Sequence, residues 1–274
     1  MIILFIVGIG ALAYPFVSDS VNNYLNQQVI NYYQNKANEE NFREMAEMQA
    51  EMERKNQEIA KQEVQAIGTD PFDEENLEEV VETPPLDYYE ENTIGIITIP
   101  DINVRLPIFN ETNALFLEKG ATLLEGTSFP TGGKSTHSVI TSHAGLTEAR
   151  LFTDLEDMVE GTQFFIDINN RTLAYEVDQI KVVLPTELDD VKIVEGEDYV
   201  TLLTCTPYMI NTHRLLVRGR RIEYLPDVGD EMEKVATSKK NEFIFWGVAT
   251  FVFVAFVLYL LYKTFKNYFI SHRN

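Results

Sequence analysis

Two long apolar runs lie at the two ends of the chain. Residues 243–262 carry no charged side chain and are rich in Phe, Val and Leu, and about 20 apolar residues are enough to cross a bilayer as a helix. Lys263, Lys266 and Arg273 follow this run. Because basic residues beside a span tend to stay in the cytoplasm, the pattern predicts a transmembrane helix at 243–262, a cytoplasmic basic tail at 263–274 and an extracellular main part.

The first 17 residues are also apolar and uncharged. A run of this length fits a short membrane anchor nearly as well as the core of a signal peptide. No Lys or Arg precedes it, and no Ala-x-Ala cleavage pattern closes it convincingly. We therefore expect an uncleaved N-terminal membrane anchor or signal-anchor at residues 1–17. Whether the true start of the protein lies upstream is left open.

Residues 18–67 have the spacing of an amphipathic helix. They are polar, with apolar residues at intervals of three to four, and a bend or break is expected within so long a helical region. A solvated stalk or coiled coil and a helix packed on the following domain remain equal alternatives. The expected apolar stripe consists of Val21, Leu25, Val29, Tyr32, Phe42, Met45, Met48, Met52 and Ile59.

Two segments are expected to connect larger parts of the chain, and the first, a lid and acidic linker, is expected to be irregular. Residues 68–91 contain Asp70-Pro71-Phe72, then a strongly acidic stretch, and then two prolines at 84 and 85 that stop any regular element. Residues 225–242 lie between the β-rich region and the C-terminal apolar run, and they are expected to form a juxtamembrane linker.

Short segments of β character fill residues 92–224. Turn sequences such as Asn169-Asn170 separate them. Many short strands with little helix between them predict a closed or nearly closed, mostly antiparallel barrel. The expected fold class is therefore mostly β, with an N-terminal helical region and two terminal transmembrane segments. The expected strands are 96–99, 104–108, 138–141, 163–168, 172–177, 181–183, 199–203 and 214–222.

Charge and motif content narrow the functional classes. The formal net charge is −21, and so acidic an exterior argues against nucleic-acid binding. The sequence has no Asp-x-Asp-x-Asp calcium loop, paired-histidine metal motif or phosphate-cradling glycine pattern. We therefore expect no metal and no cofactor.

The chain has a single cysteine, Cys205. One cysteine in an exported protein excludes an internal disulfide and leaves a free thiol. Cys205 directly follows the expected strand 199–203 and Thr204, and lies at a strand end, since Thr206-Pro207 must soon leave the strand conformation. A lone cysteine on a strand is ordinarily a buried, inert thiol, whereas a nucleophilic one needs a nearby base or cation.

Few side chains can supply that base or cation. His143 follows the expected strand 138–141, and corresponding ends of two strands in a small barrel would let it meet Cys205. Acyl transfer also needs a donor for the tetrahedral oxygen, which a fixed guanidinium can provide. Strand alternation does not choose among the arginines, because it places Arg214, Arg218 and Arg220 on one face. The remaining histidines are His137, His213 and His272.

Several motifs surround these candidates. Residues 201–208 are TLLTCTPY and residues 211–219 are NTHRLLVRG, while IGIITIP stands at 94–100 and LPI at 106–108. GTSFPTGG at 126–133 leads to Thr141-Ser142-His143. Together these motifs resemble those of the class C, pilin-polymerising sortases, and the resemblance extends across essentially the whole β domain.

The resemblance implies both a fold and a chemistry. The fold would be an eight-stranded sortase-type β-barrel, with Cys205 as the nucleophile, His143 as the general acid/base and Arg214 as the oxyanion-stabilising residue. The substrate would be a Leu-Pro-x-Thr-Gly-like sorting signal, cleaved through a threonyl thioester. The acyl group would then pass to a lysine of a pilin subunit and build covalent pili on a Gram-positive cell.

The C-terminal span and Asp70-Pro71-Phe72, which is similar to the lid motif of class C sortases, favour the pilus class. By that resemblance Asp70 would pair with Arg214 and Phe72 would pack over Cys205, although a capped helix end is the alternative for this motif. Two other functions stay open. One is a sortase that anchors surface proteins to a cell-wall precursor, and the other is a non-enzymatic, membrane-tethered stalk or adhesion protein.

Overall fold

A closed barrel of eight strands forms the centre of the computed structural model, with strand order β1-β2-β3-β4-β7-β8-β6-β5. The structure describes residues 2–36, 42–62, 67, 70–73, 84–225 and 229–271. The expected mostly β, eight-stranded barrel is confirmed. The strands are β1 Thr93–Ile99, β2 Val104–Phe109, β3 Ala121–Leu123, β4 Thr136–Thr141, β5 Gln163–Ile168, β6 Arg171–Val183, β7 Asp198–Thr206 and β8 His213–Ile222.

Helices flank the barrel and fill its connections. The long helices are α1 Ile2–Lys36, α2 Phe42–Ala60 and α5 Gly229–Ser271. The short ones are α3 Leu86–Glu91, α4 Ala114–Lys119 and the 3₁₀ turns η3 Pro100–Ile102, η4 Thr153–Asp157 and η5 Asp189–Val191.

The barrel contains parallel as well as antiparallel pairs. β2 pairs with β3 and β4 pairs with β7 in parallel, and the other neighbours are antiparallel. Parallel neighbours need a long crossover, and the chain between β4 and β7 provides it with β5 and β6. As a result, the carboxyl ends of β4 and β7 lie at the same edge of the barrel.

Two strands differ from the sequence expectation. β3 is only three residues long, too short to show an alternating pattern, and it was not expected. β6 is one continuous strand where two were expected, at 172–177 and 181–183. Its ladder with β8 shifts register between Val177 and Gln179. A β-bulge interrupts the alternation of side chains, and in the sequence this interruption resembles a turn.

β8 passes close to the aromatic core of the barrel. Phe164 and Tyr175 are fully buried and their rings stack with centroids 5.5 Å apart. A Cβ atom at Gly219 would lie 2.4 Å from the Phe164 ring. Only glycine therefore allows β8 to approach the Phe164 ring this closely. The contact fixes the position of β8, the strand that begins with His213 and Arg214.

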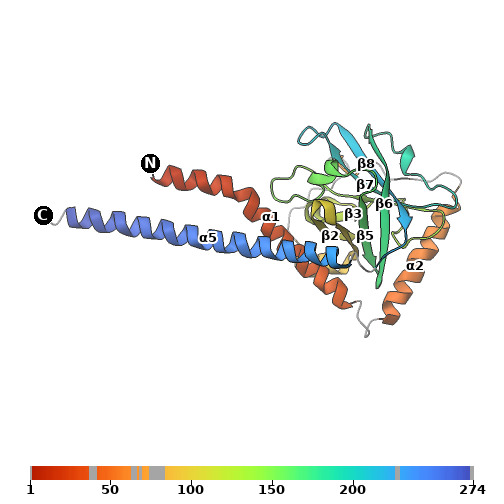
Figure 1. The fold of residues 1–274 in the computed structure, drawn as a ribbon, viewed down its shortest axis with the longest axis horizontal. Coiled ribbons are helices and arrows are strands. Elements are labelled where there is room, and N and C mark those ends of the chain that lie inside the picture. The colour runs from red at the N-terminus through yellow and green to blue at the C-terminus, as the bar shows by residue number, and fades with distance from the viewer. Residues whose placement is uncertain are drawn as a thin grey trace.

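α1 and α2 pack against the barrel wall. The Tyr33 hydroxyl donates to the Ile94 carbonyl at 2.8 Å and accepts from the Asn169 backbone N–H at 3.0 Å. On α2, Asn56 exchanges hydrogen bonds with the backbone of Phe129, with distances of 2.9 and 2.7 Å. Of the two alternatives for this region, the packed helix is confirmed and the free stalk is wrong. The expected bend is also present, since α1 and α2 run in different directions (Figure 1).

The buried face of α1 is rotated from the expected stripe. Val29, Ile30 and Tyr33 are buried, whereas Val21 and Tyr32 are exposed. The packed face is largely polar, so hydrophobic spacing could not locate it. Its buried polar residues are Ser20, Asn22, Asn23 and Asn26.

α1 and α5 lie side by side and leave the barrel in the same direction, so that both chain ends lie far from it (Figure 1). Phe16 stacks on Trp246 with ring centroids 5.1 Å apart, and Tyr24 stacks on Phe243 at 4.5 Å. The linker expected at 225–242 lies mostly within α5, which begins at Gly229.

One helix in the described part of the chain, Glu231–Leu260 within α5, is long and apolar enough to cross a membrane, by length and composition only. No second helix of this kind, such as the span expected at residues 1–17, is found in the described part of the chain. The side chains of residues 1–7 lie outside the described part, so the N-terminal anchor stays a prediction. Also outside it are Gly68, most of the acidic stretch at 74–83, and His272.

Candidate active site

Three neighbouring strands bring His143, Cys205 and Arg214 to one edge of the barrel. In the parallel β4–β7 pair, Thr141 is the partner of Leu203. His143 and Cys205 each lie two residues further along these strand directions. In the antiparallel β7–β8 pair, Cys205 is directly opposite Arg214. The three residues thus occupy one row across the sheet, although 62 and 9 positions separate them along the chain.

The turn that carries His143 is fixed by its neighbour Ser142, which is fully buried. The Ser142 hydroxyl donates to the Gly120 carbonyl at 2.7 Å, and its N–H donates to the Leu203 carbonyl at 3.2 Å. The Thr204 hydroxyl donates to the Ser142 carbonyl at 2.7 Å. These bonds extend the β4–β7 pairing beyond the strand end, so the backbone before His143 has little freedom.

The Cys205 thiol lies in a desolvated environment. The residue is 5% exposed, and burial raises the pKa of the thiol to about 11. The Arg214 charge lowers this pKa, whereas the Asp70 carboxylate raises it. Because only the thiolate is a strong nucleophile, the structure holds Cys205 in its unreactive protonated form at neutral pH.

His143 is also held neutral. Burial lowers the pKa of its imidazole to about 4. The Phe72 ring lies against the imidazole, with centroids 5.3 Å apart and planes tilted by 47°. Among the described residues no hydrogen bond joins Cys205 to His143. The two groups therefore form a neutral resting arrangement rather than a thiolate–imidazolium pair.

Asp70 occupies the guanidinium of Arg214. Nε and Nη2 of Arg214 donate to the two Asp70 carboxylate oxygens at 2.7 and 2.5 Å. Nη1 donates to the carbonyls of Asn211 and His213, both at 2.9 Å. The Phe72 ring lies 5.3 Å from the guanidinium carbon. Arg214 is 5% exposed. Its guanidinium is therefore held in one orientation, and Asp70 occupies two of its donor atoms.

An apolar surface beneath the Asp70-Pro71-Phe72 segment holds it in place. Phe72 and Ile67 pack against a cluster whose buried members come from β4, β7, β8, η5 and the residue after β3. The buried members of this cluster are Leu124, Val139, Val191, Leu203 and Leu216. Sequence reasoning missed Ile67, because a single apolar residue in a polar stretch carries no periodic signal.

Register also separates Arg214 from the other arginines of β8. Arg218 is bound to Asp178 through two hydrogen bonds of 2.9 Å, and Arg220 is bound to Glu176 at 2.9 Å. Neither is opposite Cys205 in the ladder. Of the three arginines that alternation left equal, the geometry brings Arg214 to the thiol.

His137 has a structural position in the barrel wall. It is fully buried, with Nδ1 2.9 Å from the Lys192 carbonyl and Nε2 2.7 Å from the Thr201 hydroxyl. Burial lowers the pKa of this imidazole to about 4. His213 is only partly buried and its Nδ1 lies 3.0 Å from the Thr212 hydroxyl. Within the described residues, no group of three or more His, Cys, Asp or Glu side chains could hold a metal ion.

Comparisons with known proteins agree with this geometry. A model of the sortase domain matches residues 97–222, which includes nearly the whole barrel. The crystal structure of sortase C-1 from Streptococcus pneumoniae is 41% identical with a TM-score of 0.61, over 73% of this chain and 100% of that one. The chain belongs to the sortase family. It is therefore a transpeptidase by family.

The structural neighbours of this sortase are class C enzymes. Sortase C2 of pilus island 1 from Group B Streptococcus is 45% identical with a TM-score of 0.54, over 64% of this chain and 97% of that one. Among curated relatives, sortase A of Streptococcus agalactiae is 29% identical over 116 residues, or 41% of this chain. The match spans 47% of the length of that sortase A.

Proposed function

We propose that this sortase polymerises pilins at the outer face of a Gram-positive cell membrane. It cleaves Leu-Pro-x-Thr-Gly-like sorting signals through a threonyl thioester at Cys205 and transfers the acyl group to a pilin lysine. The observation that carries this proposal is the row of His143, Cys205 and Arg214 across β4, β7 and β8. It unites a nucleophile, a proton carrier and a cation at one edge.

Acylation uses the thiol and the imidazole together. The Cys205 sulfur attacks the threonine carbonyl carbon while its proton passes to His143, and a carbon–sulfur bond forms. The carbon–nitrogen bond to glycine then breaks as His143 gives that proton to the leaving amine. A lysine amine next attacks the thioester, its proton passes to His143, and the Cys205 thiolate released as the carbon–sulfur bond breaks takes that proton. No net oxidation occurs, and one amide replaces another.

Arg214 stabilises the negative charge that develops on the carbonyl oxygen in both steps. A fixed guanidinium beside the reacting carbon acts most strongly where water is excluded. Its Nη1 bonds to two backbone carbonyls hold its orientation. Nε and Nη2, which Asp70 occupies in this structure, become available when Asp70 leaves.

Asp70 and Phe72 act as a lid over the site. Asp70 takes the donors that the oxyanion needs, and Phe72 covers the imidazole. In the closed state burial holds both reacting groups neutral. Displacement of the lid by a sorting signal removes the Asp70 charge and admits the substrate, so the enzyme becomes active only when substrate is present.

The membrane arrangement suits a substrate that is itself tethered. The apolar part of α5 anchors the C-terminus, and α1 leaves the barrel in the same direction (Figure 1). The basic residues after the span favour a cytoplasmic C-terminus. The barrel then lies outside the cell, where pilin subunits emerge.

The proposal is tested with the full-length enzyme in detergent micelles. Wild-type enzyme is incubated with a purified pilin that carries both the sorting signal and the acceptor lysine, or with the same pilin and a cell-wall precursor amine. Covalent pilin ladders, with a Cys205 acyl adduct detected by mass spectrometry, support pilin polymerisation. Transfer to the precursor alone identifies a wall-anchoring sortase. Equal activity of Cys205→Ala contradicts any role of the thiol.

A further inference from the structure

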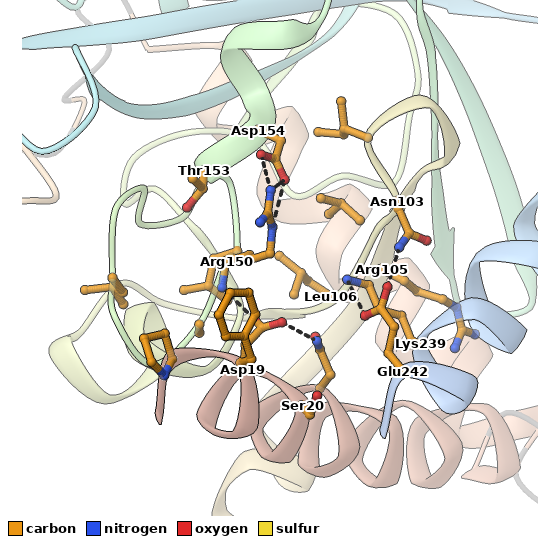
Figure 2. A pocket seen from close by; sticks show the side chains of 18 of the residues that line it. Asp19, Ser20, Asn103, Arg105, Leu106, Arg150, Thr153, Asp154, Lys239 and Glu242 are labelled. Atoms are coloured by element: carbon orange, nitrogen blue, oxygen red, sulfur yellow. Dashed lines mark hydrogen bonds and ion pairs between the residues drawn. The ribbon is translucent and has the colours of Figure 1, made fainter. Parts of the chain in front are cut away.

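The loop that follows His143 borders an open space on the side of the terminal helices. A cavity of about 760 Å³ lies between this loop, α1, α5 and the start of β2 (Figure 2). Residues 146–147 and 149–151 of the loop line this cavity together with Asp19 of α1 and Glu242 of α5. Along the cavity, polar contacts rather than continuous packing must therefore hold the loop relative to α1.

Asp19 makes the contact that spans this gap. Its Oδ1 accepts a hydrogen bond of 2.8 Å from the backbone N–H of Arg150, and Asn23 Nδ2 donates to its Oδ2 at 3.0 Å. Figure 2 shows Asp19 on α1 directed toward Arg150. Asn23 is buried one helical turn further along α1. It thus orients the carboxylate that receives the loop.

A short backbone connection leads from Arg150 to the catalytic histidine. Leu151 has a positive φ of 44°, which is strained for a residue other than glycine and persists only when its surroundings hold it. The next residue, Phe152, is fully buried, and its N–H donates to the His143 carbonyl at 3.0 Å. Asp19 therefore holds one side of the strained residue, and the bond to His143 holds the other.

The core holds the loop only in part. Ala149, Leu151 and Phe152 are buried in the main apolar cluster, whereas the Arg150 side chain is exposed and bound to Asp154. The hydrogen bond of Asp19 acts on the Arg150 backbone rather than on this side chain. Among the described residues, the other side-chain hydrogen bond from α1 to this loop is an exposed one of 3.4 Å from the Tyr14 hydroxyl to Glu148. The shorter bond of Asp19 to the loop backbone therefore sets the register of the loop relative to α1.

We infer that Asp19 is a positioning residue for His143, an inference that rests on the proposed role of His143 in proton transfer. Through Arg150, Leu151 and Phe152 it fixes the backbone of His143 beside Cys205. The helix that leads from the N-terminal apolar run thereby contributes to catalysis without contact with substrate. Small displacements of a reacting group have large effects on rate.

The test compares Asp19→Ala with Asp19→Asn in the full-length enzyme. Alanine removes the acceptor, whereas asparagine keeps an oxygen that can accept from Arg150. We expect kcat for sorting-signal cleavage to fall about tenfold in Asp19→Ala, with an unchanged KM for the signal peptide, and Asp19→Asn to recover most of the loss. The acid limb of the pH profile should move to higher pH in Asp19→Ala, because a looser loop reduces the burial that lowers the pKa of His143.

Asp101→Ala is the matched control. Asp101 lines the same cavity on the 3₁₀ turn before β2, and its loss removes the same charge, so activity and pH profile should be unchanged. Equal losses in Asp19→Ala and Asp19→Asn, or a loss explained by the unfolded fraction in thermal denaturation, would overturn the inference. So would normal Asp19→Ala kinetics. If Cys205→Ala stays inactive in that case, the proposed function stands and only the role of Asp19 fails.

Discussion

Asp70 binds Arg214 through two hydrogen bonds, and Arg214 is directly opposite Cys205 in the β7–β8 ladder. Both side chains of the ion pair are largely buried, with 14% of Asp70 and 6% of Arg214 exposed. A carboxylate so placed has two effects on the site. It raises the pKa of the neighbouring thiol, and it takes the donors that a substrate oxygen would use.

Asp70→Ala should increase the rate at which Cys205 reacts with thiol reagents at neutral pH. Removal of the carboxylate lowers the pKa of the thiol toward its ordinary value and leaves the Arg214 charge to stabilise the thiolate. The measurement is the rate of iodoacetamide labelling between pH 6 and 10. At a pH below the thiol pKa, this rate should rise about tenfold for each unit by which the pKa falls. Asp101→Ala is a control outside the lid. Unchanged labelling would remove the support for gating by Asp70.

Phe72→Ala should expose the imidazole of His143 to water. Burial lowers the pKa of this histidine to about 4, so removal of the covering ring should raise it toward about 6.5, the ordinary value. Titration of the His143 ring protons by NMR measures the change, with His137 as an internal control because the lid does not touch it. Phe72→Leu should give a smaller shift. A pKa that stays near 4 in Phe72→Ala would show that other groups bury the imidazole.

Arg214→Lys should lower kcat about 10²- to 10³-fold, as expected for loss of one directed oxyanion donor. Lysine keeps the positive charge but cannot reproduce the planar fork of the guanidinium. Kinetics with a sorting-signal peptide give kcat and KM, and KM should change little. Arg218→Lys is the matched control, since Arg218 binds Asp178 and lies away from Cys205. Equal losses in the two variants would argue against a catalytic role for Arg214.

The stability of the barrel should fall as the pH is lowered from about 6.5 to 4. His137 is neutral in the folded protein, with a pKa lowered to about 4, whereas the unfolded chain binds a proton near pH 6.5. The unfolded state therefore binds more protons within this window. The contribution of His137 to the free energy of unfolding is fully present above about pH 6.5 and is lost as the pH falls toward 4. The shift corresponds to on the order of 3 kcal/mol for this group.

Urea denaturation at several pH values measures this dependence. His137→Gln should flatten the slope in the window, even if it lowers stability at pH 7 through loss of the bonds to Lys192 and Thr201. His213→Gln is the control, because His213 lies partly exposed at the start of β8. An unchanged slope in His137→Gln would assign the pH dependence to other groups, of which His143 is the first candidate.

Local sequence patterns predicted the barrel well, but they failed at particular elements for identifiable reasons. β3 is too short to alternate, and the bulge near Asp178 interrupts the alternation of β6. On α1, three asparagines occupy the packed face, so the hydrophobic stripe correctly included Val29 but also included the exposed Val21 and Tyr32. Each prediction assumed regular spacing of buried apolar side chains. That spacing is absent at these positions.

The sequence by itself determined the nucleophile candidate, because the chain has one thiol, and its motifs named His143, Arg214, Asp70 and Phe72 through a family resemblance. Only the tertiary structure placed that arginine opposite Cys205, since alternation repeats every two residues and leaves Arg214, Arg218 and Arg220 equal. Strand register breaks that tie. The contacts of Ile67 and Asp19 had no sequence signal either, because they join segments whose approach depends on how the whole barrel closes.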